Sequence, residues 1–170
     1  SRDLDGREVF IGPTPVKALG TTDQHSQVQL YREGPNDKVF TFLQVQNFRT
    51  DLTIGPCPQS APELGYLAGA KMSKLINSEK LATEYALVKD RRPCLTVLFD
   101  EVTPQAVGEF IILYEVTTSI AGLLFHINAY DQPAVELGKE ATFALMGRSG
   151  YEDMAKKIAP FIEPDQNFLI

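Results

Sequence analysis

An α/β fold with a mainly parallel sheet is predicted by the order of two strand patterns and several long helix patterns. The segment 38–46 alternates in polarity and is rich in β-branched and aromatic residues, which is typical of a strand. The segment 93–99 is apolar on both sides, as a central parallel strand is. A long helical pattern separates them, which leaves room for a right-handed crossover. We therefore expect the two strands to be parallel neighbours.

The elements before the strand at 38–46 are expected to be short. Glycine and proline punctuate the first twenty residues, so only Glu8–Ile11 has the pattern of a strand and the rest is predicted loop. Candidate N-cap residues follow at 21–23, and a short helix is expected over His25–Arg32, ending before Gly34. Beginning as it does at a serine, the chain is expected to be a fragment of a longer protein.

Four helices are predicted after the first strand. The segment Leu64–Lys89 carries an apolar stripe that indicates core packing. A second helix is expected to start at Thr103 and to run towards His126; Gly122 could break it and leave Leu123–Ile127 as a strand, but a helix is favoured. The last two helices are expected over 132–146 and from 150 to 162.

Composition excludes several classes of protein. With 170 residues, 44% hydrophobic and 22% charged, the chain suits one globular domain with a sizeable core, or part of a larger protein. Its net charge of −6 argues against nucleic acid or an anionic membrane as a partner. Cys57 and Cys94 belong to neither a CxxC pair nor a Cys/His cluster, so zinc and thioredoxin-type chemistry lack support. No cofactor is expected. Two free thiols fit a reducing cytoplasm, and neither a signal peptide nor an uninterrupted apolar run of bilayer length is evident.

Two long polar side chains are predicted to converge at the start of the helix over 132–146. Asp131 is a preferred N-cap residue, and Gln132 and Lys139 are then two helical turns apart on one face. Because helical side chains lean towards the N-terminus, the Lys139 ammonium can approach the Gln132 amide and suit a polyhydroxylated or anionic ligand. The alternative is an ordinary solvated helix with a Glu136–Lys139 ion pair.

His25 is the second candidate. It is expected in the first helical turn, where the positive end of the helix dipole disfavours imidazolium and leaves a ring able to exchange a proton. A surface or capping histidine is the alternative.

Longer patterns around these residues resemble those of a known family. The pattern formed by Gly122, Leu124 and Phe125, four further residues, and then Tyr130-Asp131-Gln132-x-Ala134-Val135-Glu136-x-x-Lys139 resembles a signature of glucose-6-phosphate isomerases. The segment TTDQHSQVQLYREGP, at 21–35, resembles a second block of the bacterial-type enzymes. Further similarity extends over nearly the whole chain.

The resemblance implies a fold and an assembly. Enzymes of this family have two three-layer αβα sugar-isomerase (SIS) domains, and residues 1–170 would form the C-terminal one as a single domain. The intact enzyme would be a cytoplasmic homodimer of glycolysis and gluconeogenesis, in which the N-terminal SIS domain is the partner of this one.

The resemblance also implies site roles. The family interconverts glucose 6-phosphate and fructose 6-phosphate without a metal. His25 and Lys139 would assist ring opening and Gln132 would bind the substrate. The family's general base is a glutamate in a Glu-Ser-x-Gly-Lys type motif, which this chain lacks, so it is expected to be inactive alone. Two alternatives remain: a regulatory SIS module that binds a sugar phosphate without catalysis, and a purely structural or dimerisation domain.

Overall fold

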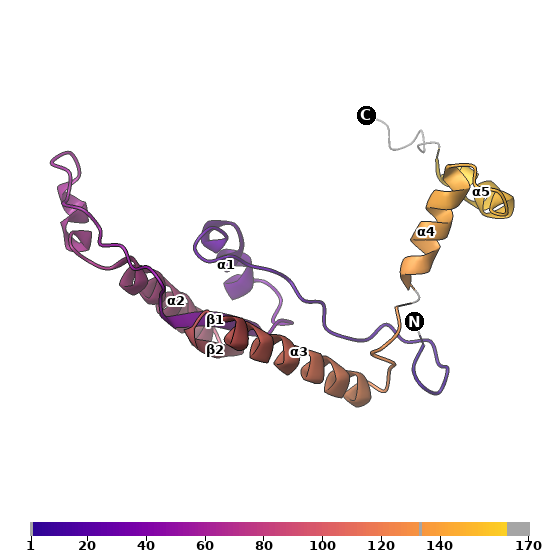
Figure 1. The fold of residues 1–170 in the computed structure, drawn as a ribbon, viewed down its shortest axis with the longest axis horizontal. Helices are drawn as coiled ribbons and strands as arrows, with labels where there is room; N and C mark the ends of the chain where they lie inside the picture. The colour runs from indigo at the N-terminus through magenta and orange to yellow at the C-terminus, as the bar shows by residue number, and fades with distance from the viewer. Residues whose placement is uncertain (1, 133, 163–170) are drawn as a thin grey trace. The chain divides into compact units, whose positions relative to one another are not determined.

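The computed structural model describes residues 2–132 and 134–162. They form two compact units, one comprising 14–114 and the other the described parts of 1–13 and 115–170, and each is considered by itself. Figure 1 shows the helices and strands, coloured along the chain. The structure also has two short 3₁₀ helices, η1 and η2. In chain order the elements are α1 (Gln24–Glu33), β1 (Phe40–Asn47), η1 (Pro62–Leu67), α2 (Met72–Lys89), β2 (Cys94–Glu101), α3 (Pro104–Leu124), α4 (Ala134–Leu145), α5 (Glu152–Ile158) and η2 (Ala159–Phe161).

The sheet of the first unit consists of β1 and β2, which pair in parallel from Phe40 opposite Cys94 to Asn47 opposite Glu101. Helix α2 connects the two strands and packs on both of them (Figure 1). The prediction of neighbouring parallel strands joined by a helical crossover is therefore confirmed, and with it the α/β class.

The helix predicted over Leu64–Lys89 is shorter than expected. Residues 62–67 form η1, the chain then turns, and α2 begins at Met72. Gly69 has a φ of 78°, in the left-handed region that glycine adopts without strain, so the two helical segments cannot be continuous. The first turn of α2 is capped by Asp51, which precedes Ser73 by 22 residues in sequence. The Asp51 carboxylate accepts hydrogen bonds from the Ser73 amide, at 3.0 Å, and from the Ser73 hydroxyl, at 2.7 Å.

Helix α3 confirms the helical alternative for its C-terminal end. The Thr103 hydroxyl accepts a hydrogen bond from the Ala106 amide at 3.1 Å, as an N-cap residue does. Gly122 lies inside the helix and does not break it. A Cβ atom on Gly122 would lie 2.6 Å from that of Ala129, so glycine here permits the turn after α3 to fold back against the helix.

The second unit is built on a helical hairpin. Helices α4 and α5 pack together, with the rings of Phe143 and Tyr151 5.5 Å apart and the Arg148 guanidinium over both.

The predicted strand over Glu8–Ile11 is wrong, because Glu8 forms only an isolated bridge with Arg2. The last predicted helix is confirmed in part, since it is divided between α5 and η2.

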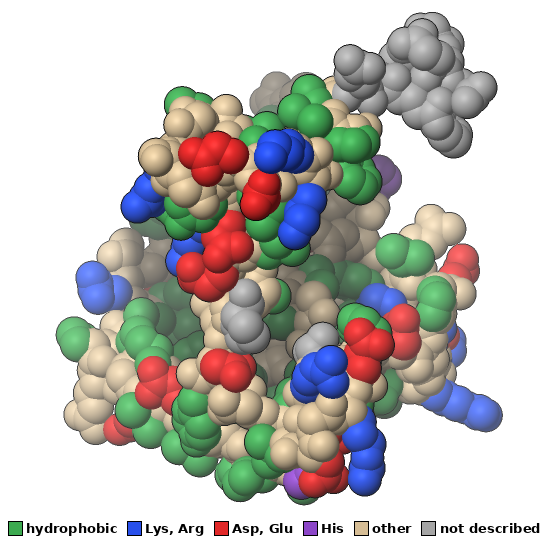
Figure 2. Space-filling model, turned by 90° about the vertical axis from the view of Figure 1, so that its right-hand side faces the viewer, with side chains coloured by type: hydrophobic (Ala, Val, Ile, Leu, Met, Phe, Trp, Pro, Cys, Tyr) green, Lys and Arg blue, Asp and Glu red, His purple; other side chains and the backbone are tan. Residues whose placement is uncertain are grey.

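The sizeable core expected from composition is absent from the described residues. Among their hydrophobic side chains only Leu87 and Ala144 are buried. Figure 2 shows hydrophobic side chains at the surface beside acidic and basic ones. Helix α3 is rich in apolar residues, and many of them are exposed: Ile112, for example, is 57% accessible and Leu124 81%. Within the described part of the chain, α3 is long and apolar enough to span a bilayer by length and composition, a test that core helices also pass.

Candidate functional site

His25 is the second residue of α1, in the first turn as predicted, and its side chain is exposed. It borders a shallow hollow of about 380 Å³ along that helix, which also includes Val28 and Arg32. Two helical turns separate His25 from Arg32, so the hollow follows one side of the helix. A small polar molecule could reach the imidazole from solvent without any rearrangement of α1.

Polar contacts attach α1 to α2 and the turn that follows it. The Gln24 side-chain amide donates to the Thr83 hydroxyl at 2.7 Å, and Arg32 Nε lies 2.5 Å from an Asp90 carboxylate oxygen. The Asp90 carboxylate, mainly through this hydrogen bond, raises the pKa of Arg32 above its ordinary value. No local pattern in the sequence predicts these partners. Gln24 could have been noticed because it lies three and four residues from Gln27 and Val28, on the half-buried face of the helix.

Lys139 lies in the second turn of α4 and is 55% exposed, with Nζ 2.6 Å from a Glu136 carboxylate oxygen. This is the ion pair of the simpler alternative, although it lies at the surface and is not buried. Gln132 is also exposed and lies before the first described helical residue, Ala134. The helix predicted from 132 therefore begins later than expected, and Pro133 lies outside the described residues. The convergence of Gln132 and Lys139 on a ligand stays a prediction.

His25 belongs to the unit formed by 14–114, whereas Gln132 and Lys139 belong to the other unit. His25 and Lys139 are thus carried by different helices, α1 and α4, each within its own unit.

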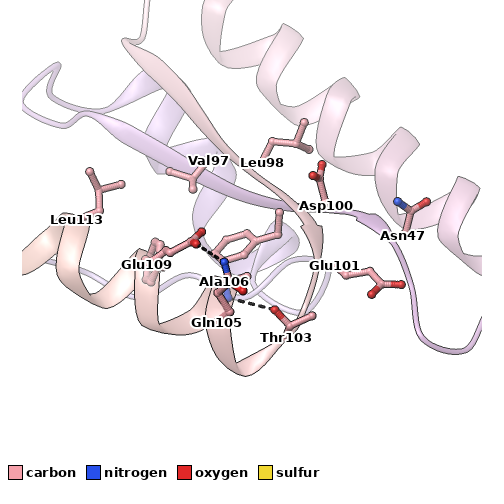
Figure 3. Close-up of a pocket in the computed structure, with 12 residues that line it drawn as sticks. Asn47, Val97, Leu98, Asp100, Glu101, Thr103, Gln105, Ala106, Glu109 and Leu113 are labelled. Carbon is pink, nitrogen blue, oxygen red and sulfur yellow. Dashed lines mark hydrogen bonds between the residues drawn. The ribbon is translucent and has the colours of Figure 1, made fainter.

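A larger hollow, of about 620 Å³, lies at the carboxyl ends of the two strands (Figure 3). Three acidic residues line it, Asp100 and Glu101 at the end of β2 and Glu109 on α3, and no basic residue does so among the described residues. The Glu109 carboxylate accepts a bond from the Gln105 amide at 2.8 Å. Ligands of open α/β sheets commonly bind at this edge. Three carboxylates would nevertheless repel a phosphate group, so this hollow does not suit an anionic substrate.

Neither cysteine forms a reactive centre. The Cys57 thiol donates to the Ala61 carbonyl oxygen at 3.0 Å, and burial raises the pKa of Cys94, with a smaller contribution from the nearby Glu84 carboxylate. A raised pKa lowers the thiolate fraction on which nucleophilicity depends. Across the part of the chain that the structure describes, no three histidine, cysteine or acidic side chains are grouped as metal ligands.

The chain is similar in sequence and structure to known proteins. The family model for phosphoglucose isomerase matches residues 66–158. The glucose-6-phosphate isomerase of Carboxydothermus hydrogenoformans is 52% identical over 153 residues, which are 90% of this chain and 33% of that protein. The crystal structure of a hypothetical protein from Thermus thermophilus superposes with a TM-score of 0.79 at 37% identity, over 86% of this chain and 35% of that one.

A second solved structure, a glucose-6-phosphate isomerase from Chlamydia trachomatis, shares the fold with a TM-score of 0.67 at 19% identity, over 95% of this chain and 32% of that one. Fold and matches together define an α/β domain of the sugar-isomerase type. The chain belongs to the phosphoglucose isomerase family. It spans about a third of the length of these relatives.

Proposed function

We propose that this chain is the C-terminal SIS domain of a cytoplasmic glucose-6-phosphate isomerase, which interconverts glucose 6-phosphate and fructose 6-phosphate without a metal or cofactor. The observation that carries the proposal is the family match over 66–158, because this range contains both Gln132 and Lys139 in their signature pattern. The intact enzyme would be a homodimer, each subunit having a second, N-terminal SIS domain.

Three side chains would supply the chemistry of ring opening and binding. Opening the pyranose requires a proton at the ring oxygen and removal of the proton from the C1 hydroxyl. A neutral His25 imidazole and the Lys139 ammonium together provide the base and the acid for this step. Gln132 would donate and accept hydrogen bonds at substrate hydroxyls. The later proton transfer between C1 and C2, through an enediolate, would use the upstream glutamate that this chain lacks.

The ion pair of Lys139 does not prevent this role. Lys139 and Glu136 are 55% and 62% exposed, and an ion pair at the surface contributes only about 0–1 kcal/mol. The ammonium can therefore leave Glu136 for a substrate oxygen at little cost.

The exposure of apolar side chains supports a role as one domain of a larger enzyme. Helix α3 exposes many apolar side chains, which in a family of this kind favours a helix buried by the rest of a large protein. A sheet of two strands also leaves both outer edges without a β partner in the described residues. Further strands and helices of the full-length enzyme would cover these surfaces.

A coupled assay of glucose 6-phosphate conversion tests the proposal. The isolated chain should show no turnover, because the base is absent, and the protein at the full length of its relatives should be active. Turnover by the isolated chain within a hundredfold of an intact enzyme would show that the base has been misplaced. A full-length protein that binds glucose 6-phosphate but does not convert it would favour the regulatory SIS module.

A further inference from the structure

Helix α1 is held against its unit by one face only. The half-buried side chains recur three and four residues apart, and Gln24, Gln27, Val28, Tyr31 and Arg32 form this face. No residue of α1 is buried, and the closest aromatic contact is that of Tyr31 with Phe40 of β1, at 4.9 Å between ring centroids. A hydrophobic core therefore does not fix the helix that carries His25.

The first attachment lies beside His25. Gln24 Nε2 donates to Thr83 Oγ1 at 2.7 Å, in the middle of α2. The single hydroxyl proton of Thr83 can be donated either to Gln24 Oε1, at 3.0 Å, or to the Glu79 carbonyl oxygen, at 2.8 Å. In both cases the amide keeps its bond to the hydroxyl. Because Gln24 directly precedes His25, this bond fixes the backbone from which the imidazole projects.

The second attachment lies at the other end of α1. The Arg92 guanidinium donates to the Arg32 carbonyl oxygen at 2.5 and 3.0 Å and to the Gly34 carbonyl oxygen at 2.9 Å. The last carbonyl groups of a helix have no partner within the helix, and a cation there also interacts favourably with the helix dipole. The Arg32 side chain adds its ion pair with Asp90, 2.5 Å apart. Both ends of α1 are thus attached to α2 or to the turn after it.

We propose that Gln24, Thr83 and Arg92 are positioning residues for His25, which set the place of its imidazole through the two ends of α1. The inference rests on the proposed role of His25 in ring opening and adds the residues that make that role possible. None of the three needs to touch the substrate. A displacement of about 1 Å at a reacting group can cost about 100-fold in rate, so a helix attached at both ends has a catalytic consequence.

The test is made in the full-length enzyme, with a cyclic sugar phosphate and with an open-chain sugar phosphate that cannot cyclise. Thr83→Val keeps the branched shape and removes the hydroxyl, whereas Thr83→Ser keeps the hydroxyl. Gln24→Met is matched by Gln29→Met, since Gln29 is an exposed glutamine of the same helix that bonds only within it, to Glu33. Thermal unfolding midpoints are measured for all variants, and rates are compared well below the lowest of them.

Thr83→Val, Gln24→Met and Arg92→Met should lower kcat/KM for the cyclic substrate about 10- to 100-fold and leave the open-chain substrate within about twofold. Thr83→Ser and Gln29→Met should stay within about twofold on both substrates. Equal losses on the two substrates, no loss on either, or a loss that Thr83→Ser fails to relieve would overturn the inference.

His25→Ala, measured in the same series, separates this inference from the proposed function. If His25→Ala affects both substrates equally, the ring-opening role itself is wrong. If it affects only the cyclic substrate while Thr83→Val and Gln24→Met affect neither, the positioning inference alone is wrong.

Discussion

The two helices that carry the candidate ring-opening groups are held in different ways. Helix α1, with His25, is attached at both ends by the side chains of Gln24 and Arg92, which reach partners 58 to 60 residues away in sequence. Helix α4, with Lys139, packs on α5, while the ion pair of Lys139 among the described residues is local, with Glu136. The comparison indicates that contacts distant in sequence hold the helix that carries the His25 imidazole, whereas the Lys139 ammonium is held by a surface ion pair with Glu136.

Loss of either group gives the largest expected effect. In the full-length enzyme, His25→Ala should lower kcat/KM for a cyclic sugar phosphate about 10²- to 10⁴-fold, the usual size of a general acid–base contribution. An open-chain substrate should lose much less, because it needs no ring opening. Lys139→Ala should show the same selectivity with an additional rise in KM, since in the proposed role its ammonium would also contact substrate oxygens. Equal losses on both substrates for either variant would remove that residue from ring opening.

A second prediction concerns the packing of α2, the helix to which α1 is attached. Leu87 of α2 is 1% exposed, so Leu87→Ala should destabilise the protein by about 2–5 kcal/mol through lost burial and a cavity. Leu81→Ala is the matched control, because Leu81 lies on the same helix and is 64% exposed, and its effect should stay within about 0.5 kcal/mol. Urea unfolding measures both. Equal effects of the two variants would mean that Leu87 is not part of a packed core.

The sequence predicted the parallel strand pair and the place of His25, because hydrophobic periodicity and helix capping are local signals. It did not predict the separation of η1 from α2, which depends on a positive φ at Gly69. Nor did it predict the role of Gly122, since the approach of Ala129 is a tertiary contact. The bond between Gln24 and Thr83 joins residues 59 positions apart, which periodicity cannot reveal.

A third prediction uses pH to test how α2, to which α1 is attached, is itself capped. The hydrogen bonds from the Ser73 hydroxyl and then from the Ser73 amide lower the pKa of Asp51 below its ordinary value of 3.8. A lowered pKa in the folded state means that stabilisation is present above the unfolded pKa and is lost as pH falls through the folded one. The stability advantage of the parent over Asp51→Asn should therefore be constant well above pH 3.8 and be lost as pH falls below that value, through the lowered pKa of the folded state.

Thermal unfolding of both proteins between about pH 2.5 and 7 measures this difference. Asp153→Asn is the control, because Asp153 is exposed and pairs only with Lys156 at the surface. An advantage that grew as pH fell would show that the cap acts through some other group than the ionised Asp51 carboxylate.

The smallest expected effect tests whether Lys139 is indeed free. Removing the negative charge with Glu136→Gln breaks an exposed i, i+3 ion pair, so the free energy of unfolding should change by less than about 1 kcal/mol. In the full-length enzyme kcat/KM should change by less than about twofold, because the ammonium gives up little when it leaves Glu136. Glu140→Gln, at an exposed acid on the same helix, controls for the general effect of removing one negative charge. A rise of tenfold or more in kcat/KM that is specific to Glu136→Gln would mean that the pair holds Lys139 away from the substrate. In that case α4 would restrain its catalytic group as firmly as α1 does, and the contrast between the two helices would no longer hold.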